Sequence, residues 1–151
     1  MTDTGATMPA EGPSFVHTLR IRLGECDIQG VVFNAHYLTY IDDAIDVWFS
    51  TAFEGADYQK EFDVMLKKIE LEWFAPARHG DILELALWIS RWGNSSFDMA
   101  VDATVNGERI ITAKAIYVSV TPGEHVPCPV PGFVREALSK PLPNPTAVVS
   151  S

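Results

Sequence analysis

The segment with the most chemical potential runs from Gly24 to Tyr37. It holds the carboxylate of Asp27 between two glycines, Gly24 and Gly30, in the composition of a shaped loop. Aspartate is ordinarily ionised at neutral pH, so it can attack a carbonyl carbon or activate water as a general base. Asp27 could instead serve only to close a turn, as aspartate does in many loops.

A helix is predicted to follow this loop directly, beginning at about Asn34. The first N–H groups of a helix have no internal partners and carry the positive end of its dipole, so they can stabilise a developing oxyanion. The backbone N–H of Asn34 is therefore a candidate oxyanion donor, although Asn34 could also be only an N-cap. His36 could act as a base, but a hydrogen bond to a neighbour is the favoured role.

The pattern of the rest of the chain predicts the elements that position this loop. The helix, 34–53, contains no Pro or Gly and carries a wide apolar face. Alternating apolar residues and turn signals, among them Asn106-Gly107, predict strands. We place these strands at 15–23, 65–73, 82–90, 96–105 and 109–120. One helix and five strands joined by short turns indicate an antiparallel sheet packed on a helix, in the α+β class.

Composition limits the kind of protein this is. A net charge of −9 and a pI of about 4.7 oppose nucleic acid and anionic membrane surfaces, and no stretch is long and apolar enough to span a bilayer. We expect one domain at 14–138 with flexible tails at 1–13 and 139–151. Only Cys26 and Cys128 are present, which suits free thiols in the cytoplasm, and no metal-ligand spacing occurs.

The motif Gly24-Glu-Cys-Asp-x-x-Gly-Val-Val-Phe-x-x-x-Tyr37 resembles the signature of the 4-hydroxybenzoyl-CoA thioesterase family, and the similarity extends over roughly 15–138. The resemblance implies a hotdog fold, in which a five-stranded antiparallel sheet wraps around one long central helix. It also implies that Asp27 is catalytic and that the backbone N–H of Asn34 polarises a thioester carbonyl. Many members have His at the position of Asn34 and Asn at the position of His36, but a backbone role does not depend on the side chain.

The resemblance further implies an acyl-CoA thioesterase that works as a homodimer or homotetramer, with active sites between subunits. No cofactor or metal is expected, since coenzyme A is part of the substrate. The net negative charge opposes its phosphates, so some basic side chains must lie nearby; the candidates are Arg91, Lys67, Lys68, Arg78 and Arg109, with Arg91 preferred. The residues predicted to bind substrate are Gly30, Val31, Val32, Phe33, Tyr37, Arg91, Trp92, Ser95 and Ser96.

Other functions remain open at this stage. A hotdog hydratase or dehydratase would use Asp27 and His36 as an acid–base pair, and a non-catalytic acyl-CoA-binding protein would keep the fold without turnover. An acyl carrier protein could replace coenzyme A as the thiol carrier. The sequence does not identify the acyl group.

Overall fold

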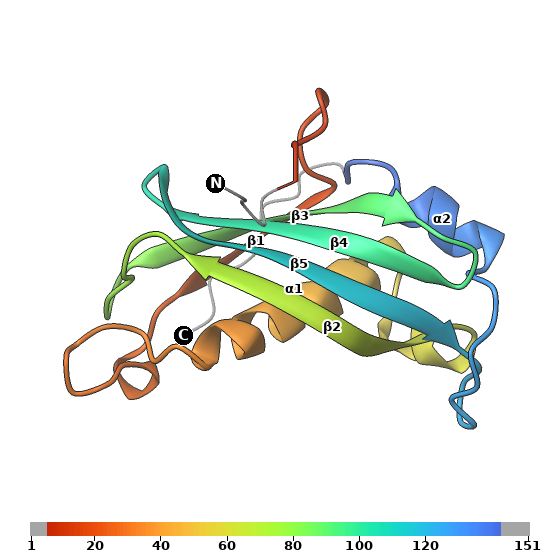
Figure 1. The fold of residues 1–151 in the computed structure, drawn as a ribbon, viewed down its shortest axis with the longest axis horizontal. Helices are drawn as coiled ribbons and strands as arrows, with labels where there is room; N and C mark the ends of the chain where they lie inside the picture. Colours follow the sequence, from red (N-terminus) through yellow and green to blue (C-terminus); the bar gives the residue numbers. More distant parts are fainter. Residues whose placement is uncertain (1–5, 143–151) are drawn as a thin grey trace.

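The computed structural model describes residues 6–142 and contains a single antiparallel sheet of five strands (Figure 1). The strand order is β1-β3-β4-β5-β2, so the first two strands lie at opposite edges. The bounds are Phe15–Arg20 for β1, Asp63–Trp73 for β2, Ile82–Trp92 for β3, Ser96–Val105 for β4 and Glu108–Val120 for β5. The predicted five-stranded antiparallel sheet is therefore confirmed.

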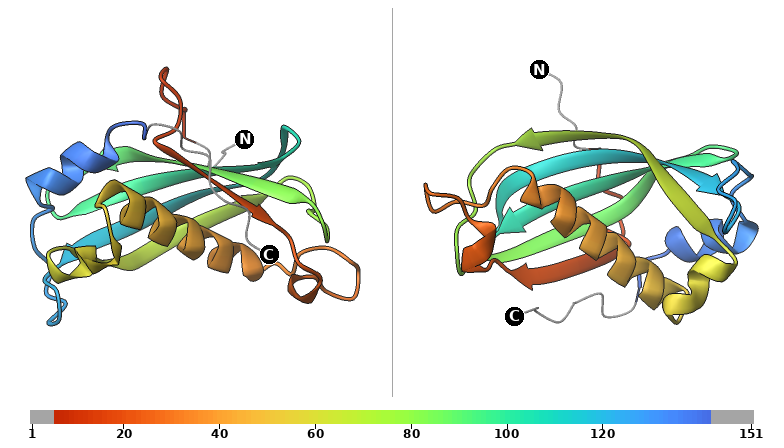
Figure 2. Two further views of the ribbon diagram at one scale, coloured as in Figure 1. Left: turned by 180° about the vertical axis from the view of Figure 1, so that it is seen from behind. Right: turned by 90° about the horizontal axis from the view of Figure 1, so that it is seen from below.

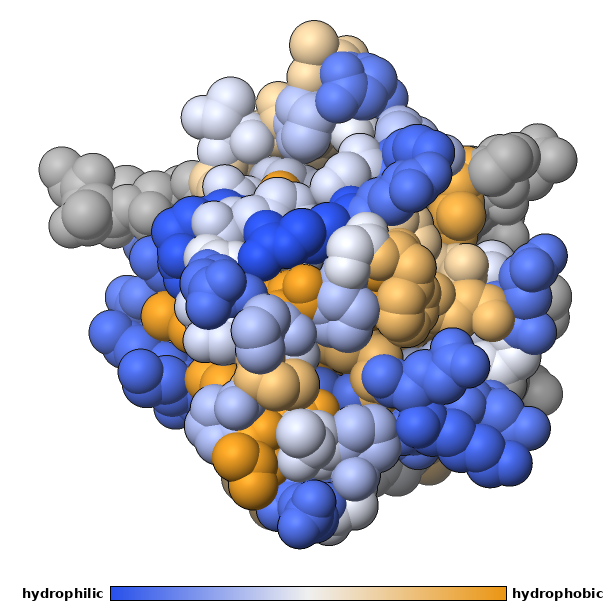
Figure 3. Space-filling model, turned by 90° about the vertical axis from the view of Figure 1, so that its right-hand side faces the viewer, coloured by the Kyte–Doolittle hydropathy of each residue, from blue (hydrophilic) through white to orange (hydrophobic). Residues whose placement is uncertain are grey.

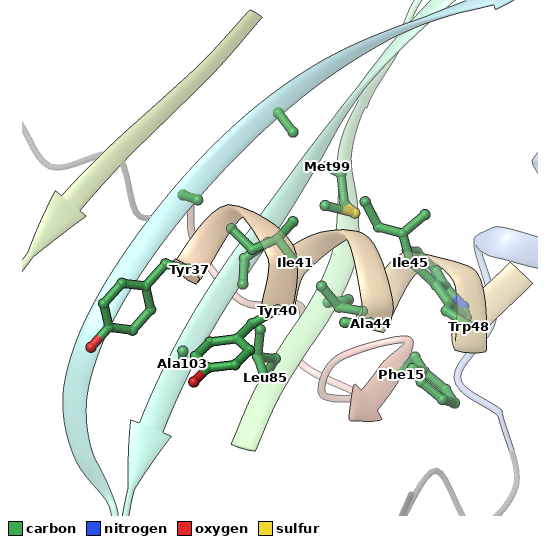
Figure 4. Close-up of a cluster of buried hydrophobic side chains, with 14 of the residues drawn as sticks. Phe15, Tyr37, Tyr40, Ile41, Ala44, Ile45, Trp48, Leu85, Met99 and Ala103 are labelled. Carbon is green, nitrogen blue, oxygen red and sulfur yellow. The ribbon is translucent and has the colours of Figure 1, made fainter. Parts of the chain in front are cut away.

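Helix α1, His36–Ala52, lies along the concave face of the sheet, which curves over it (Figure 2). It buries an aromatic and aliphatic face against the sheet, and Trp48 of this face stacks on Phe15 of β1 with ring centroids 6.5 Å apart (Figure 4). The buried helix residues are Tyr37, Tyr40, Ile41, Ala44, Ile45, Trp48 and Phe49. Truncating a side chain such as Trp48, which is 0% exposed, would cost about 3–5 kcal/mol of stability.

The predicted start of the helix was wrong by two residues. The chain stays extended through Phe33 because the N–H of Val32 donates to the Ala77 carbonyl and that of Phe33 to the Glu25 carbonyl. A turn follows, and Ala35 is the N-cap without a side-chain hydrogen bond, so Asn34 does not cap the helix. The helix has 17 residues, about 25 Å, which is shorter than the roughly 30 Å that the apolar pattern predicted.

Three short helical elements were not predicted. Leu23–Glu25 forms a 3₁₀ turn, η1, which ends the first strand early, and Ala56–Lys60 forms a second, η2. Helix α2, Gly132–Leu138, follows Pro131 and has seven residues, too few for a clear apolar period. Among residues 6–142, no helix is long and apolar enough to cross a membrane.

The convex face of the sheet combines apolar side chains with ion pairs between neighbouring strands. Trp88 is only 3% exposed within the single chain, while Ile82 at the sheet end is 40% exposed. Much of this face carries ion pairs between neighbouring strands. They join Arg91 to Asp98, Arg109 to Asp102 and Lys114 to Glu70.

Candidate active site

A tight hairpin between Cys26 and Val32 holds Asp27 at the entrance to α1. The N–H of Asp27 donates to the Val31 carbonyl at 2.9 Å, and the N–H of Gly30 donates to the Asp27 carbonyl at 2.9 Å. Gly30 has φ +80°, the left-handed conformation that completes a three-residue hairpin loop of this kind and that glycine adopts without a steric cost. Gly30 therefore has a conformational role in the loop.

The side chain of Asp27 takes part in this turn. Its Oδ1 accepts a hydrogen bond from the Gln29 N–H at 2.8 Å, and the residue is half-buried. The turn-closing role considered from the sequence is thus present in the structure. It leaves the second carboxylate oxygen without a hydrogen bond among the described residues, so the turn and a chemical role are compatible.

Glu25 ties the hairpin to the helix. Its Oε1 accepts hydrogen bonds from the Tyr40 hydroxyl at 2.9 Å and from the Arg22 N–H at 2.8 Å, and its carbonyl accepts from the Phe33 N–H. Burial and then the Glu25 carboxylate raise the pKa of Tyr40 far above its ordinary value, so the hydroxyl remains a donor. This pair was not among the predicted site residues, although Glu25 belongs to the motif.

The N–H groups at the entrance to α1 are free. Within the described residues, neither Asn34 nor Ala35 donates a backbone hydrogen bond, whereas the N–H groups of Val32 and Phe33 just before them are both bonded. Unpaired donors at the start of a helix are suited to a carbonyl oxygen or an anion. The structure therefore allows the donor role that was predicted for the backbone of Asn34.

A cleft of about 450 Å³ opens at this point. Its walls are the second half of the hairpin, the start of α1, and the chain that leaves the end of β2. The lining residues are Val31, Val32, Asn34, Tyr37, Trp73, Phe74, Ala75 and Pro76. Apolar and aromatic side chains dominate, with free N–H groups at one place, as in many small-molecule sites.

Tyr37 lines this cleft, and its hydroxyl interacts with the Ala77 backbone. Burial is the main cause that raises its pKa; contact with the Ala77 backbone lowers it, and nearby Cys26 and Asp81 raise it further. The phenol is therefore protonated at neutral pH. It can donate a hydrogen bond to a ligand or accept one.

The structure brings some of the predicted substrate-binding residues together and not others. Val31, Val32 and Tyr37 line the cleft with Asn34, while Gly30 shapes the hairpin and Phe33 points to solvent with 53% of its surface exposed. The wall 73–76 was missed as a site segment. This segment begins at Trp73, where β2 ends, and continues into the connection to β3.

The end of β3 and the start of β4 lie at the opposite end of the sheet within one chain (Figure 1), and this connection carries Arg91, Trp92, Ser95 and Ser96. Trp73 aligns through β5 with Ala103, seven positions along β4 from Ser96, a distance of about 23 Å. Figure 3 shows this end, where hydrophilic residues surround small apolar areas.

The groups at that end already have partners. The Arg91 guanidinium lies 2.9 Å from Asp98 and 3.2 Å from the Ser96 hydroxyl. The indole N–H of Trp92 donates to the Ser139 hydroxyl, and Arg135 lies 5.4 Å above the Trp92 ring. A role in substrate binding for Arg91, Trp92, Ser95 and Ser96 stays a prediction. Their distance from the cleft within a single chain does not favour that role.

Among residues 6–142 there is no group of three or more His, Cys, Asp or Glu side chains that could hold a metal ion.

A family model described as the thioesterase-like superfamily matches residues 21–138, which include the hairpin, α1 and every strand after β1. The match is broader than the predicted 4-hydroxybenzoyl-CoA thioesterase family, which stays a prediction. No curated protein sequence matches the chain.

Solved structures share the fold. A thioesterase superfamily protein from Jannaschia sp. CCS1 is 21% identical with a TM-score of 0.80, and covers 91% of this chain and 99% of its own. A thioesterase from Thermus thermophilus, solved with coenzyme A and Zn, is 25% identical with a TM-score of 0.75, at 85% and 93% coverage. A 1,4-dihydroxy-2-naphthoyl-CoA thioesterase from Synechocystis is 22% identical with a TM-score of 0.71, at 82% and 94% coverage.

Proposed function

This chain belongs to the thioesterase-like superfamily and has its hotdog-type fold, and from that premise we propose that it hydrolyses an acyl-CoA thioester to a free acid and coenzyme A. Solved neighbours that are named as acyl-CoA thioesterases, and one that binds coenzyme A, support the substrate class. The observation that carries the proposal is the cleft at the start of α1, where the unpaired N–H of Asn34 lies beside the hairpin of Asp27.

In the proposed mechanism the thioester carbonyl oxygen accepts a hydrogen bond from the Asn34 N–H. In the general-base route, Asp27 takes a proton from water as the water oxygen attacks the carbonyl carbon. In the nucleophilic route, a carboxylate oxygen of Asp27 attacks directly and forms a mixed anhydride, which water then hydrolyses. In both routes the C–S bond breaks, the thiolate of coenzyme A leaves and takes up a proton, and the donor stabilises the oxyanion of the transition state.

Arg78 is the cation that we place beside the coenzyme A phosphates. Its backbone bridges to Val31 at the edge of the cleft, and its side chain is exposed. The other basic candidates are less well placed. Arg91 is at the far end, and Arg109 is held by Asp102 at 3.2 Å.

We further propose a homodimer with active sites between subunits. Strand β2 is an edge strand of 11 residues, and it exposes 51% of Met65 and 47% of Leu66. A long, partly apolar edge invites pairing with another chain. The second copy would then lie beside both α1 and the cleft.

The proposed location is the cytoplasm. Cys26 and Cys128 are free thiols, which is compatible with a reducing compartment.

The replacement Asp27→Asn tests the function. Asparagine keeps an Oδ1 acceptor for the Gln29 N–H, so the turn survives while the charge is lost. We expect kcat/KM on a panel of aromatic and aliphatic acyl-CoAs, followed by thiol release, to fall at least a hundredfold. The melting temperature should stay within about 3 °C of that of the wild type, since the effect on stability is small.

Asp81→Asn is the matched control, because Asp81 also accepts a backbone hydrogen bond in a turn, from the Arg78 N–H at 2.9 Å. It should retain activity. Full activity of Asp27→Asn would show that Asp27 serves only to close the turn. If the wild type hydrolyses no acyl-CoA, the alternative of a non-catalytic acyl-CoA-binding protein is favoured. The hydratase alternative needs Asp27 and His36 to act together, and within the described residues no interaction joins them; hydration of an enoyl-CoA in the same panel would restore it.

A further inference from the structure

The N–H of Asn34, which is the proposed oxyanion donor, shares a peptide unit with the carbonyl of Phe33. This carbonyl accepts a hydrogen bond from the His36 N–H at 2.8 Å. The peptide bond is trans, and in a planar trans unit the N–H and the C=O point in opposite directions. Because the carbonyl is turned toward the first turn of α1, the N–H of Asn34 points away from that turn.

Glu25 holds the chain on the other side of this peptide unit. Its carbonyl oxygen accepts the N–H of Phe33 at 3.1 Å. Its Oε1 accepts two further hydrogen bonds, from the Tyr40 hydroxyl at 2.9 Å and from the backbone N–H of Arg22 at 2.8 Å, while Oε2 lies 3.6 Å from the Arg22 Nε. Glu25 therefore joins η1, the chain just before Asn34, and the second turn of α1.

Tyr40 is the fixed end of this connection. It is 2% exposed, and its ring meets the rings of Tyr37 and His36 edge-on, with centroids 5.8 Å and 6.1 Å away. The two tyrosines lie side by side at the start of α1 (Figure 4). A buried ring that is packed in this way has little freedom to move, so the Tyr40 hydroxyl has a defined position relative to the helix.

We infer that Glu25 and Tyr40 are positioning residues for the oxyanion donor. The Tyr40 hydroxyl holds Glu25 against the helix, and the Glu25 carbonyl then holds Phe33. Since the Phe33 carbonyl is also bonded to His36, the peptide unit is restrained at both ends and the Asn34 N–H keeps its direction. A donor that is oriented in advance stabilises a developing oxyanion without a cost for reorganisation. Neither Glu25 nor Tyr40 lines the cleft, so both act through this peptide unit.

The inference rests on the proposed thioesterase function, and Tyr40→Phe tests it. This variant loses the hydroxyl and keeps the ring that packs in the core. We expect kcat for the best acyl-CoA of the panel to fall about tenfold while KM stays within about twofold, because a displaced donor weakens transition-state stabilisation more than substrate binding. Glu25→Ala should lower kcat at least as much. Glu25→Gln keeps an oxygen that accepts from Tyr40 and should stay within about threefold of the wild type.

Tyr58→Phe is the matched control. The Tyr58 hydroxyl also donates to a carboxylate, that of Asp46 at 3.4 Å, and its ring also packs on α1, 5.7 Å from Phe49, but Tyr58 does not line the cleft. Its kcat should stay within about twofold of the wild type. Circular dichroism at the assay temperature checks that each variant is folded. Glu25 is less buried than Tyr40, so its two variants carry the test if Tyr40→Phe does not fold.

A double variant separates positioning from a general loss of stability. Asn34→Pro has no donor left to position, so adding Tyr40→Phe to it should change kcat by less than about twofold. A tenfold loss in both backgrounds, an unchanged kcat for Tyr40→Phe, or equal losses for Glu25→Gln and Glu25→Ala would each overturn this inference and leave the thioesterase function intact. A wild type that hydrolyses no acyl-CoA overturns the proposed function and this inference with it.

Discussion

At the residue scale, Asp27 has a structural role that is compatible with the chemical role proposed for it. One carboxylate oxygen accepts the Gln29 N–H, which restrains the side chain within the hairpin; Asp27 itself does not line the cleft, whose nearest hairpin residue is Val31. A side chain held by such a bond loses little further entropy when it reacts, which is the advantage of preorganisation. The role proposed for the neighbouring Asn34 uses its backbone N–H, so the identity of its side chain should matter less.

Replacing Asn34 with proline removes this N–H and no hydrogen bond within the described residues. We expect Asn34→Pro to lower kcat by about 10²–10³, the usual loss for one oxyanion donor. Asn34→Ala keeps the N–H and should remain within about threefold of the wild type, since no cap is lost. Steady-state kinetics with circular dichroism as a check on folding measures both; equal activity of the two variants would place the oxyanion elsewhere.

At the scale of elements, the contact of β1 with α1 contains a polar residue in an apolar layer. His17 is 7% exposed, and its Nδ1 has no hydrogen-bond partner among the described residues. Burial lowers the pKa of His17 from its ordinary 6.5, and the charge of Asp43 opposes this in part. The folded protein therefore holds the imidazole neutral at a pH where the unfolded chain begins to protonate it.

This difference predicts how stability changes with pH. Below about pH 6.5 the unfolded state binds a proton that the folded state does not, so the free energy of unfolding falls as the pH decreases. The stability of the folded protein does not depend on His17 protonation above about pH 6.5. Between that pH and the lower folded pKa of His17, the free energy of unfolding falls as the pH decreases. Urea unfolding at pH 7.5 and 5.5 should show a smaller loss for His17→Leu than for the wild type; equal losses would show that His17 titrates normally.

At the scale of the whole molecule, the open edge of the sheet and the net negative charge together determine how the chain associates with other molecules. Strand β2 exposes its length and two apolar side chains, while the net charge of −9 limits non-specific association. A specific pairing through β2 is thus the association that the surface best supports. It would place the second copy beside the cleft that the end of β2 helps to form.

Met65→Glu tests the pairing, because Met65 is 51% exposed on the edge strand. A charge placed there should shift the sedimentation coefficient from dimer toward monomer at micromolar concentration and lower thioesterase activity together. Met8→Glu, at a residue that is 39% exposed near the N-terminus, should change neither property. A wild type that sediments as a monomer with full activity would contradict the shared site.

The sequence alone was enough for the parts that depend on local patterns. Alternation identified all five strands, and the apolar face identified α1, because side chains must follow the period of the element that buries them. The motif from Gly24 to Tyr37 predicted a site at Asp27 and Asn34, since a loop carboxylate and a helix N-terminus are adjacent along the chain, and the catalytic roles of these residues stay a prediction. Helix α2 has too few residues for a period, and the start of α1 depended on two hydrogen bonds from residues far away in sequence.

Only the tertiary structure decided what lies across from the motif. The hydrogen bonds that order the strands as β1-β3-β4-β5-β2 bring the end of β2 to the hairpin and carry Arg91 to the far end of the sheet. Strand pairing decides which residues lie near the hairpin. The local sequence pattern around Arg91 carries no information about that pairing. A cavity of about 300 Å³ lined by residues of α1, η2, β2 and β5 has the same origin, because these elements meet only in the folded chain.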